Sequence, residues 1–118
     1  IEPIPDGAYE VEVEDVQLTE AASSGNPMLK WRLRIHSGGF ENRLLWKNRA
    51  ITGGSLKWVK QDLETCGLQL AELSALPAHL GDLVHQRLEV VKRTRGEFYD
   101  IYFQRRLPER VSDDDLPF

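Results

Sequence analysis

Residues 52–67 read TGGSLKWVKQDLETCG, and this stretch decides the fold because it is the clearest helical pattern in a chain of strand-like segments. Its apolar residues recur at spacings of three and four, the period of one helix face. These residues are Leu56, Val59, Leu63 and Cys66. Ser55 suits the N-cap position and Gly67 suits the position after the helix end. We predict one helix over residues 56–66.

Strand-like segments flank this helix, three before it and two after it. In them apolar and polar residues alternate with the strand period of two. The predicted strands cover residues 9–14, 29–35, 43–51, 87–94 and 98–104. Arg95-Gly96-Glu97 is typical of a hairpin turn between the last two. Residues 68–86 are predicted to be a connector with short helical turns that Pro77 interrupts.

Five short strands with a helix between the third and the fourth form the element order of an OB-fold, a five-stranded Greek-key barrel of the all-β or α+β class. The periodicity also fits another small α+β barrel. A length of 118 residues is that of one domain. We assign residues 1–108 to the OB-fold domain and residues 109–118 to an acidic C-terminal tail.

Composition sets the compartment that we expect. A hydrophobic content of 41% and a charged content of 29% are those of an ordinary globular protein. No apolar run approaches the roughly 18 residues of a membrane span, so we expect no membrane partner. The single cysteine, Cys66, cannot form an intramolecular disulfide, and a cytoplasmic location follows as the simplest expectation.

Charge is distributed unevenly along the chain. Residues 1–20 hold seven acidic side chains and no Lys or Arg, and residues 109–118 hold four acidic side chains and one Arg. The 15 basic and 19 acidic side chains of the whole chain therefore leave 14 basic and 8 acidic ones in residues 21–108. A net charge of −4 thus conceals a basic body, which suits a polyanionic partner.

Basic residues concentrate on the strands that an OB-fold uses for its ligand. We predict that those on the second and third strands face outward. These residues, with three more on the fourth strand and its turn, are predicted to contact the phosphates of a single strand and release counterions. The alternative is a solvated face without a ligand. The predicted phosphate contacts are Lys30, Arg32, Arg34, Arg43, Lys47, Arg49, Lys92, Arg93 and Arg95.

Ten aromatic rings are available for stacking on unpaired bases. Tyr9 and Trp31 alternate with charged neighbours as core residues do, so we expect them to pack inside. Phe40 follows two glycines, Trp46 stands between basic residues, and Tyr102 belongs to an alternating set that we expect to point outward with Phe98. We predict Phe40, Trp46 and Tyr102 as the stacking residues, against the alternative of a core role.

Enzyme chemistry finds little support in the residue pattern. The three histidines and Cys66 lack metal-ligand spacing, and Gly53-Gly54-Ser55-Leu56-Lys57 lacks the order of a phosphate-binding loop. The carboxylates of the first strand repeat along one solvated face. We therefore expect no catalytic residues, no metal and no cofactor.

The tail combines charge with an apolar tip, in the order Asp113, Asp114, Asp115, Leu116, Pro117 and Phe118. A shallow pocket can hold the apolar tip, while a basic rim accepts the aspartates and the terminal carboxylate. We predict these six residues as a partner-binding segment.

These residues resemble the acidic C-terminal tip of bacterial single-stranded-DNA-binding proteins. The body is similar to a family of small phage-encoded single-strand binders at Pro5-Asp6-Gly7, at Ser24-Gly25-Asn26-Pro27-Met28-Leu29-Lys30 and at Leu45-Trp46. The resemblance implies a protein that coats single-stranded DNA in the cytoplasm of a bacterial host. It also implies that the tip recruits replication, recombination or repair enzymes. Only about ten residues follow Leu107-Pro108, whereas bacterial members usually carry a long linker there.

Two other functions remain open from the residues. The barrel could be a protein-interaction adaptor that uses its tail without binding DNA, or a small metal-dependent nuclease. A sheet edge left by an open barrel could also pair with a second copy, which makes a homo-oligomer possible.

Overall fold

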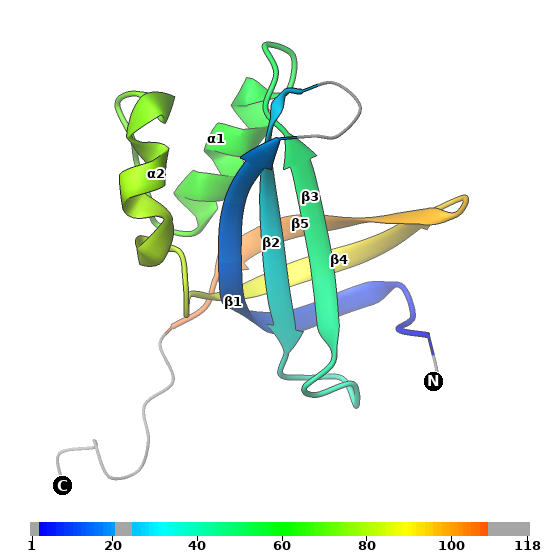
Figure 1. Cartoon of the computed structure of the whole chain (residues 1–118). Coiled ribbons are helices and arrows are strands. Elements are labelled where there is room, and N and C mark those ends of the chain that lie inside the picture. Colours follow the sequence, from blue (N-terminus) through cyan, green and yellow to red (C-terminus); the bar gives the residue numbers. More distant parts are fainter. Residues whose placement is uncertain (1–2, 21–24, 109–118) are drawn as a thin grey trace, which may run out of the picture.

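The computed structural model describes residues 3–20 and 25–108, which form a small α+β domain built on one open, antiparallel sheet (Figure 1). Five strands make up this sheet in the order β3-β2-β1-β4-β5. Their bounds are β1 Gly7–Glu20, β2 Pro27–Ile35, β3 Leu44–Ala50, β4 Arg87–Arg95 and β5 Phe98–Arg106. The predicted order of strands and helix is confirmed.

The central strand β1 pairs with a different neighbour along each half. Its first half, from Gly7 to Glu12, pairs with β4, and its second half, from Val11 onward, pairs with β2. The register with β2 shifts between Val13 and Asp15, where one extra residue forms a bulge. A bulge bends a strand and increases its twist, which lets one strand belong to both halves of the sheet.

The helical segments all lie between β3 and β4, and Figure 1 shows α1 and α2 next to each other at one side of the sheet. Their bounds are α1 Leu56–Thr65, α2 Leu76–His79 and the 3-10 turns η1 Leu73–Ala75 and η2 Leu80–Asp82. The predicted helix is confirmed, and Gly67 after its end has a φ of 85° that favours glycine. Pro77 lies in the first turn of α2, so it begins a helix and does not interrupt one.

One face of the sheet and the buried faces of the helices enclose a single core. Trp31 of β2 is fully buried, and its ring meets the ring of Phe103 edge to face with centroids 4.9 Å apart. Val59 and Leu63 of α1 and Leu76 of α2 are also buried there. The prediction that Tyr9 and Trp31 pack inside is confirmed. Among the described helices, none combines the length and the apolar character that crossing a membrane requires.

The two edge strands, β3 and β5, contact each other through side chains. The backbone N–H of Trp46 donates to the Tyr99 hydroxyl at 3.0 Å, and the Lys47 ammonium donates to the backbone carbonyl of Ile101. The sheet pairings that join the described strands do not include one between β3 and β5. The edges therefore face each other across a seam that side chains bridge.

Asp6 ties the start of the chain to β4, which suggests a test of the fold at low pH. Its carboxylate accepts hydrogen bonds from the Thr94 hydroxyl at 2.6 Å and the Thr94 N–H at 2.9 Å, and Lys92 lies at 3.2 Å. The Thr94 hydroxyl is the main reason that the pKa of Asp6 falls to about 2 from 3.8. Because the pKa is lower in the folded state, these bonds stabilise the fold above about pH 4 and are lost as the pH falls towards 2.

We therefore expect Asp6→Asn to lower the melting temperature at neutral pH and to make no difference near pH 2. Circular dichroism melts across that range measure the difference between the two chains. A companion variant, Thr94→Val, removes the hydroxyl donor, so the pKa of Asp6 in an NMR titration should move back towards its usual range. A Thr94→Val chain in which that pKa stays the same would contradict the assignment.

Candidate nucleic-acid interface

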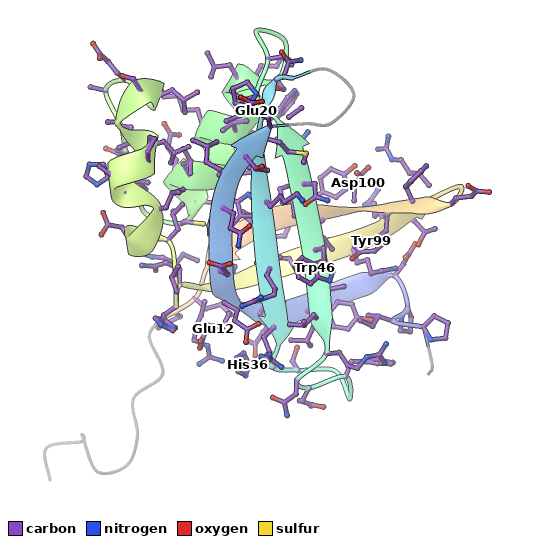
Figure 2. The ribbon with its side chains drawn as sticks, viewed as in Figure 1. Glu12, Glu20, His36, Trp46, Tyr99 and Asp100 are labelled. Carbon is purple, nitrogen blue, oxygen red and sulfur yellow. The ribbon has the colours of Figure 1, made fainter. Side chains whose placement is uncertain are left out.

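A hollow of about 400 Å³ lies between β3 and the turn of the β4–β5 hairpin, and we call it the Trp46 hollow. Its aromatic walls are Trp46 from β3 and Phe98 and Tyr99 from β5. Trp46 is 48% exposed and Phe98 is 78% exposed, whereas Tyr99 is partly buried against the core. Figure 2 shows Trp46, Tyr99 and Asp100 near one another on the two edge strands. The hollow therefore offers two large accessible rings.

Strand geometry explains why Trp46 faces outward. Leu45 and Lys47 are its buried neighbours on β3, and alternation leaves Trp46 on the opposite face. The short hairpin turn at Gly96, whose φ is 60°, brings Phe98 to the start of β5 beside the hollow. The exposed position of Phe98 that the alternation indicates is confirmed.

Lys47 points into the interior at the β3–β5 seam, so the prediction that it faces outward is wrong. Its side chain is only 6% exposed. The ammonium donates to the Ile101 carbonyl, lies 3.4 Å from Oδ2 of Asp62 on α1, and stands 5.1 Å from the centroid of the Phe103 ring. These partners come from two other elements, so a buried lysine is satisfied without a ligand.

Burial dominates the ionisation of this Lys47–Asp62 pair. It lowers the pKa of Lys47 and raises the pKa of Asp62, while the attraction between the two charges opposes both changes. Each charge is thus kept in the interior by the other.

Arg49 lies two residues further along β3 and is half-buried. It lines the Trp46 hollow together with Lys47. Its Nε is buried and has no hydrogen-bond partner among the described residues. A buried donor without an acceptor is uncommon in folded proteins, and the same side chain places a positive charge on the wall of the hollow, which suits an anionic ligand.

Lys92, a predicted phosphate contact on β4, is likewise buried. Its ammonium bonds Asp6 and the Thr94 hydroxyl, and it stands 4.8 Å from the centroid of the Tyr99 ring. Lys92 therefore makes a cation–π contact with the ring of Tyr99.

The predicted cations on β2 lie on the outer face of the sheet. Arg32 and Arg34 form ion pairs with Glu14 of β1 at 2.8 and 2.6 Å. The hydrogen bond from Arg34 is the main reason that the pKa of Glu14 is lowered, so this carboxylate stays charged and offsets both arginines. Lys30 is exposed on the same face and pairs across the strands with Asn48 of β3.

The remaining predicted residues occupy three other places. Phe40 is partly buried and meets the ring of Tyr9 edge to face at 6.2 Å, so it contributes to packing. Arg43 immediately precedes β3 and is half-buried. Another hollow, of about 390 Å³, is lined by Val91, Arg93, Arg95, Tyr102 and Gln104.

In the hollow of about 390 Å³, Arg95 forms an ion pair with Asp100 at 3.4 Å and donates to the Tyr102 hydroxyl at 2.9 Å.

The six predicted partner-binding residues of the tail, Asp113 to Phe118, lie outside the described residues. The structure thus brings Trp46, Lys47 and Arg49 together at the seam. Lys30, Arg32, Arg34 and Phe40 do not line the Trp46 hollow, although Lys30 and Arg32 are the cross-strand partners of Asn48 and Trp46.

Sequence reasoning missed one exposed ring, that of Trp58 on α1. A signal was available, because Val59 and Leu63 define the buried face of the helix and Trp58 falls outside it. In the described residues, 3–20 and 25–108, no three His, Cys, Asp or Glu side chains are grouped so that they could hold a metal ion.

The comparison with known proteins identifies a family whose function is unknown. The model of a family described as "Protein of unknown function (DUF669)" matches residues 1–114. No curated protein sequence matches the chain.

Proposed function

We propose that this chain, which belongs to the DUF669 family of unknown function, binds single-stranded DNA with little sequence preference at the Trp46 hollow. The observation that carries this proposal is the pair of exposed rings, Trp46 and Phe98, which line one hollow beside the half-buried guanidinium of Arg49. Stacking on rings requires bases with free faces, which a single strand offers and a duplex does not.

Electrostatics supports the same ligand. Residues 21–108 carry 14 basic and 8 acidic side chains, but β1 adds Glu10, Glu12, Glu14, Asp15 and Glu20 to the same domain. The attraction for a polyanion is therefore local, at the cations Lys47 and Arg49 that line the hollow. Arg49 places a positive charge on the wall of the hollow, and this charge favours a backbone phosphate there.

The fold that we propose for this sheet is an OB-fold. The strand order, the position of α1 between β3 and β4, and the side-chain contacts that join β3 to β5 all support it. An OB-fold binds its ligand on the second and third strands and in the neighbouring loops, and Trp46, Asn48 and Phe98 occupy such positions.

We further propose that Asp113, Asp114, Asp115, Leu116, Pro117 and Phe118 recruit replication, recombination or repair enzymes. This part of the proposal depends on the resemblance of the tip and on its combination of charge and apolar side chains.

The experiment is a fluorescence titration of the chain with oligo-dT and with a duplex of the same length. We expect oligo-dT to quench tryptophan emission and the duplex to bind much more weakly. Affinity for oligo-dT should fall between about 50 and about 200 mM salt, with a log–log slope of about −0.7 for each phosphate contacted. A chain that binds neither ligand, or prefers the duplex, refutes the proposal and favours the protein-interaction adaptor.

A further inference from the structure

A second hollow, of about 450 Å³, lies along the same seam, and we call it the Trp58 hollow. Its lining includes Trp58 and Gln61 from α1 and Tyr102 and Gln104 from β5. Lys47 and Arg49 line this hollow as well as the Trp46 hollow. The two hollows are therefore adjacent, and they share the basic side chains of Lys47 and Arg49 on β3.

Trp58 is the accessible ring of this second hollow. It is 47% exposed, which nearly equals the exposure of Trp46. The ammonium of Lys57 stands 4.8 Å from its ring centroid, so a positive charge accompanies the ring. A large ring left accessible next to cations is the arrangement on which an unpaired base stacks.

Arg49 provides the link between the two rings. It lines both hollows, and its buried Nε has no acceptor among the described residues. The side chain is half-buried, and its positive charge acts on both Lys47 and Asp62. Because Arg49 lines both hollows, its charge favours a phosphate in either of them.

We propose that Trp58 is a second base-stacking position, and that the strand runs along the β3–β5 seam from Trp46 and Phe98, past Arg49, to Trp58. This inference rests on the proposed function, and it adds the path of the strand and the number of its stacking positions. It places the strand along the edge of the sheet between β3, β5 and α1, whereas Glu14 offsets Arg32 and Arg34 on β2.

The three tryptophans allow each position to be observed separately. Trp31 is fully buried, so Trp46 and Trp58 are the two that a ligand can reach. A Trp58→Phe chain then reports on the Trp46 hollow, and a Trp46→Phe chain reports on the Trp58 hollow. Both are titrated with oligo-dT of about two to about sixteen nucleotides, which brackets the sites of about 4 to 16 nucleotides that single OB-folds bind.

We expect the shortest oligomers that bind to quench only one of the two reporters, and longer ones to quench both. Trp58→Ala should lower affinity for the longest oligomer about tenfold, which lies within the effect of losing one stacked base. It should leave affinity for the shortest oligomers within about twofold. Leu56→Ala is the matched control, because Leu56 is an exposed residue of the same helix turn that lines a different hollow.

The outcomes separate this inference from the proposed function. If the unmodified chain binds no oligo-dT, both proposals fail. If it binds, but Trp58 is quenched at no length and Trp58→Ala changes nothing, only the second position is refuted. An equal loss of affinity at every length also refutes it, because the two rings would then hold the same base. Thermal melts of each variant establish that it is folded.

Discussion

A chain carrying Trp46→Ala and Phe98→Ala together is expected to bind oligo-dT at least about 30-fold more weakly than the unmodified chain. Each stacked base contributes about 1–3 kcal/mol, so the loss of two rings costs at least about 2 kcal/mol of binding free energy. Phe98 is largely exposed, so its removal should change the free energy of unfolding by less than about 0.5 kcal/mol. Trp46 is about half-exposed and its removal will cost more stability, so affinities are compared at a temperature where the variant is folded.

Phe40→Ala is the informative control for this measurement. Phe40 is of the same type as Phe98, and it packs edge to face on Tyr9 away from the Trp46 hollow. We expect it to lower stability while leaving the affinity of the folded chain unchanged, as anisotropy titrations below the melting temperature measure. If Phe40→Ala weakened binding as much as the double variant, stacking at the Trp46 hollow would not explain the affinity.

The second large effect concerns the buried pair beneath the seam. Asp62→Ala is expected to lower the free energy of unfolding by about 3 kcal/mol, because it leaves the Lys47 ammonium buried without its counter-charge. Burial already lowers the pKa of Lys47 and Asp62 opposes this, so the loss of Asp62 should lower that pKa further, and the cost should shrink as the pH rises and the lysine loses its proton. Urea denaturation at neutral pH measures the loss.

A double variant separates the cost of an unpaired charge from the value of the pair. Lys47→Met with Asp62→Leu replaces both charges by apolar groups of similar size, which is often neutral or stabilising for buried pairs. We therefore expect it to recover most of the stability that Asp62→Ala loses. A double variant that is less stable than Asp62→Ala would show that the pair itself stabilises the fold.

Local signals in the sequence were sufficient to predict the order of the strands and the main helix, but not the length of β1, which was predicted over residues 9–14 and spans Gly7–Glu20. The helix over α1 and the strand β2 follow from residues that are close in sequence, such as Leu56 and Val59 or Trp31 and Leu33. The bulge between Val13 and Asp15 was not predictable in this way, because it depends on the register with β2. Pairing partners lie far apart in sequence, and periodicity does not identify them.

The candidate site was predictable only in part, for a physical reason that Lys47 illustrates. Charge suggested an outward position, but alternation puts Lys47 on the same face of β3 as the buried Leu45. A lysine is tolerated there because Asp62 and the Ile101 carbonyl accept its charge. Neither partner is adjacent to it in sequence, so the local pattern could not reveal them.

The central claim is that an unpaired strand lies in the seam between β3 and β5, and photo-cross-linking of oligo-dT to the chain tests it most directly. Mass spectrometry then identifies the attached residues. The account predicts attachment at Trp46 and Phe98, and at Trp58 with longer oligomers. Attachment confined to the outer face of β1 and β2, around Glu14, Arg32 and Arg34, would contradict it.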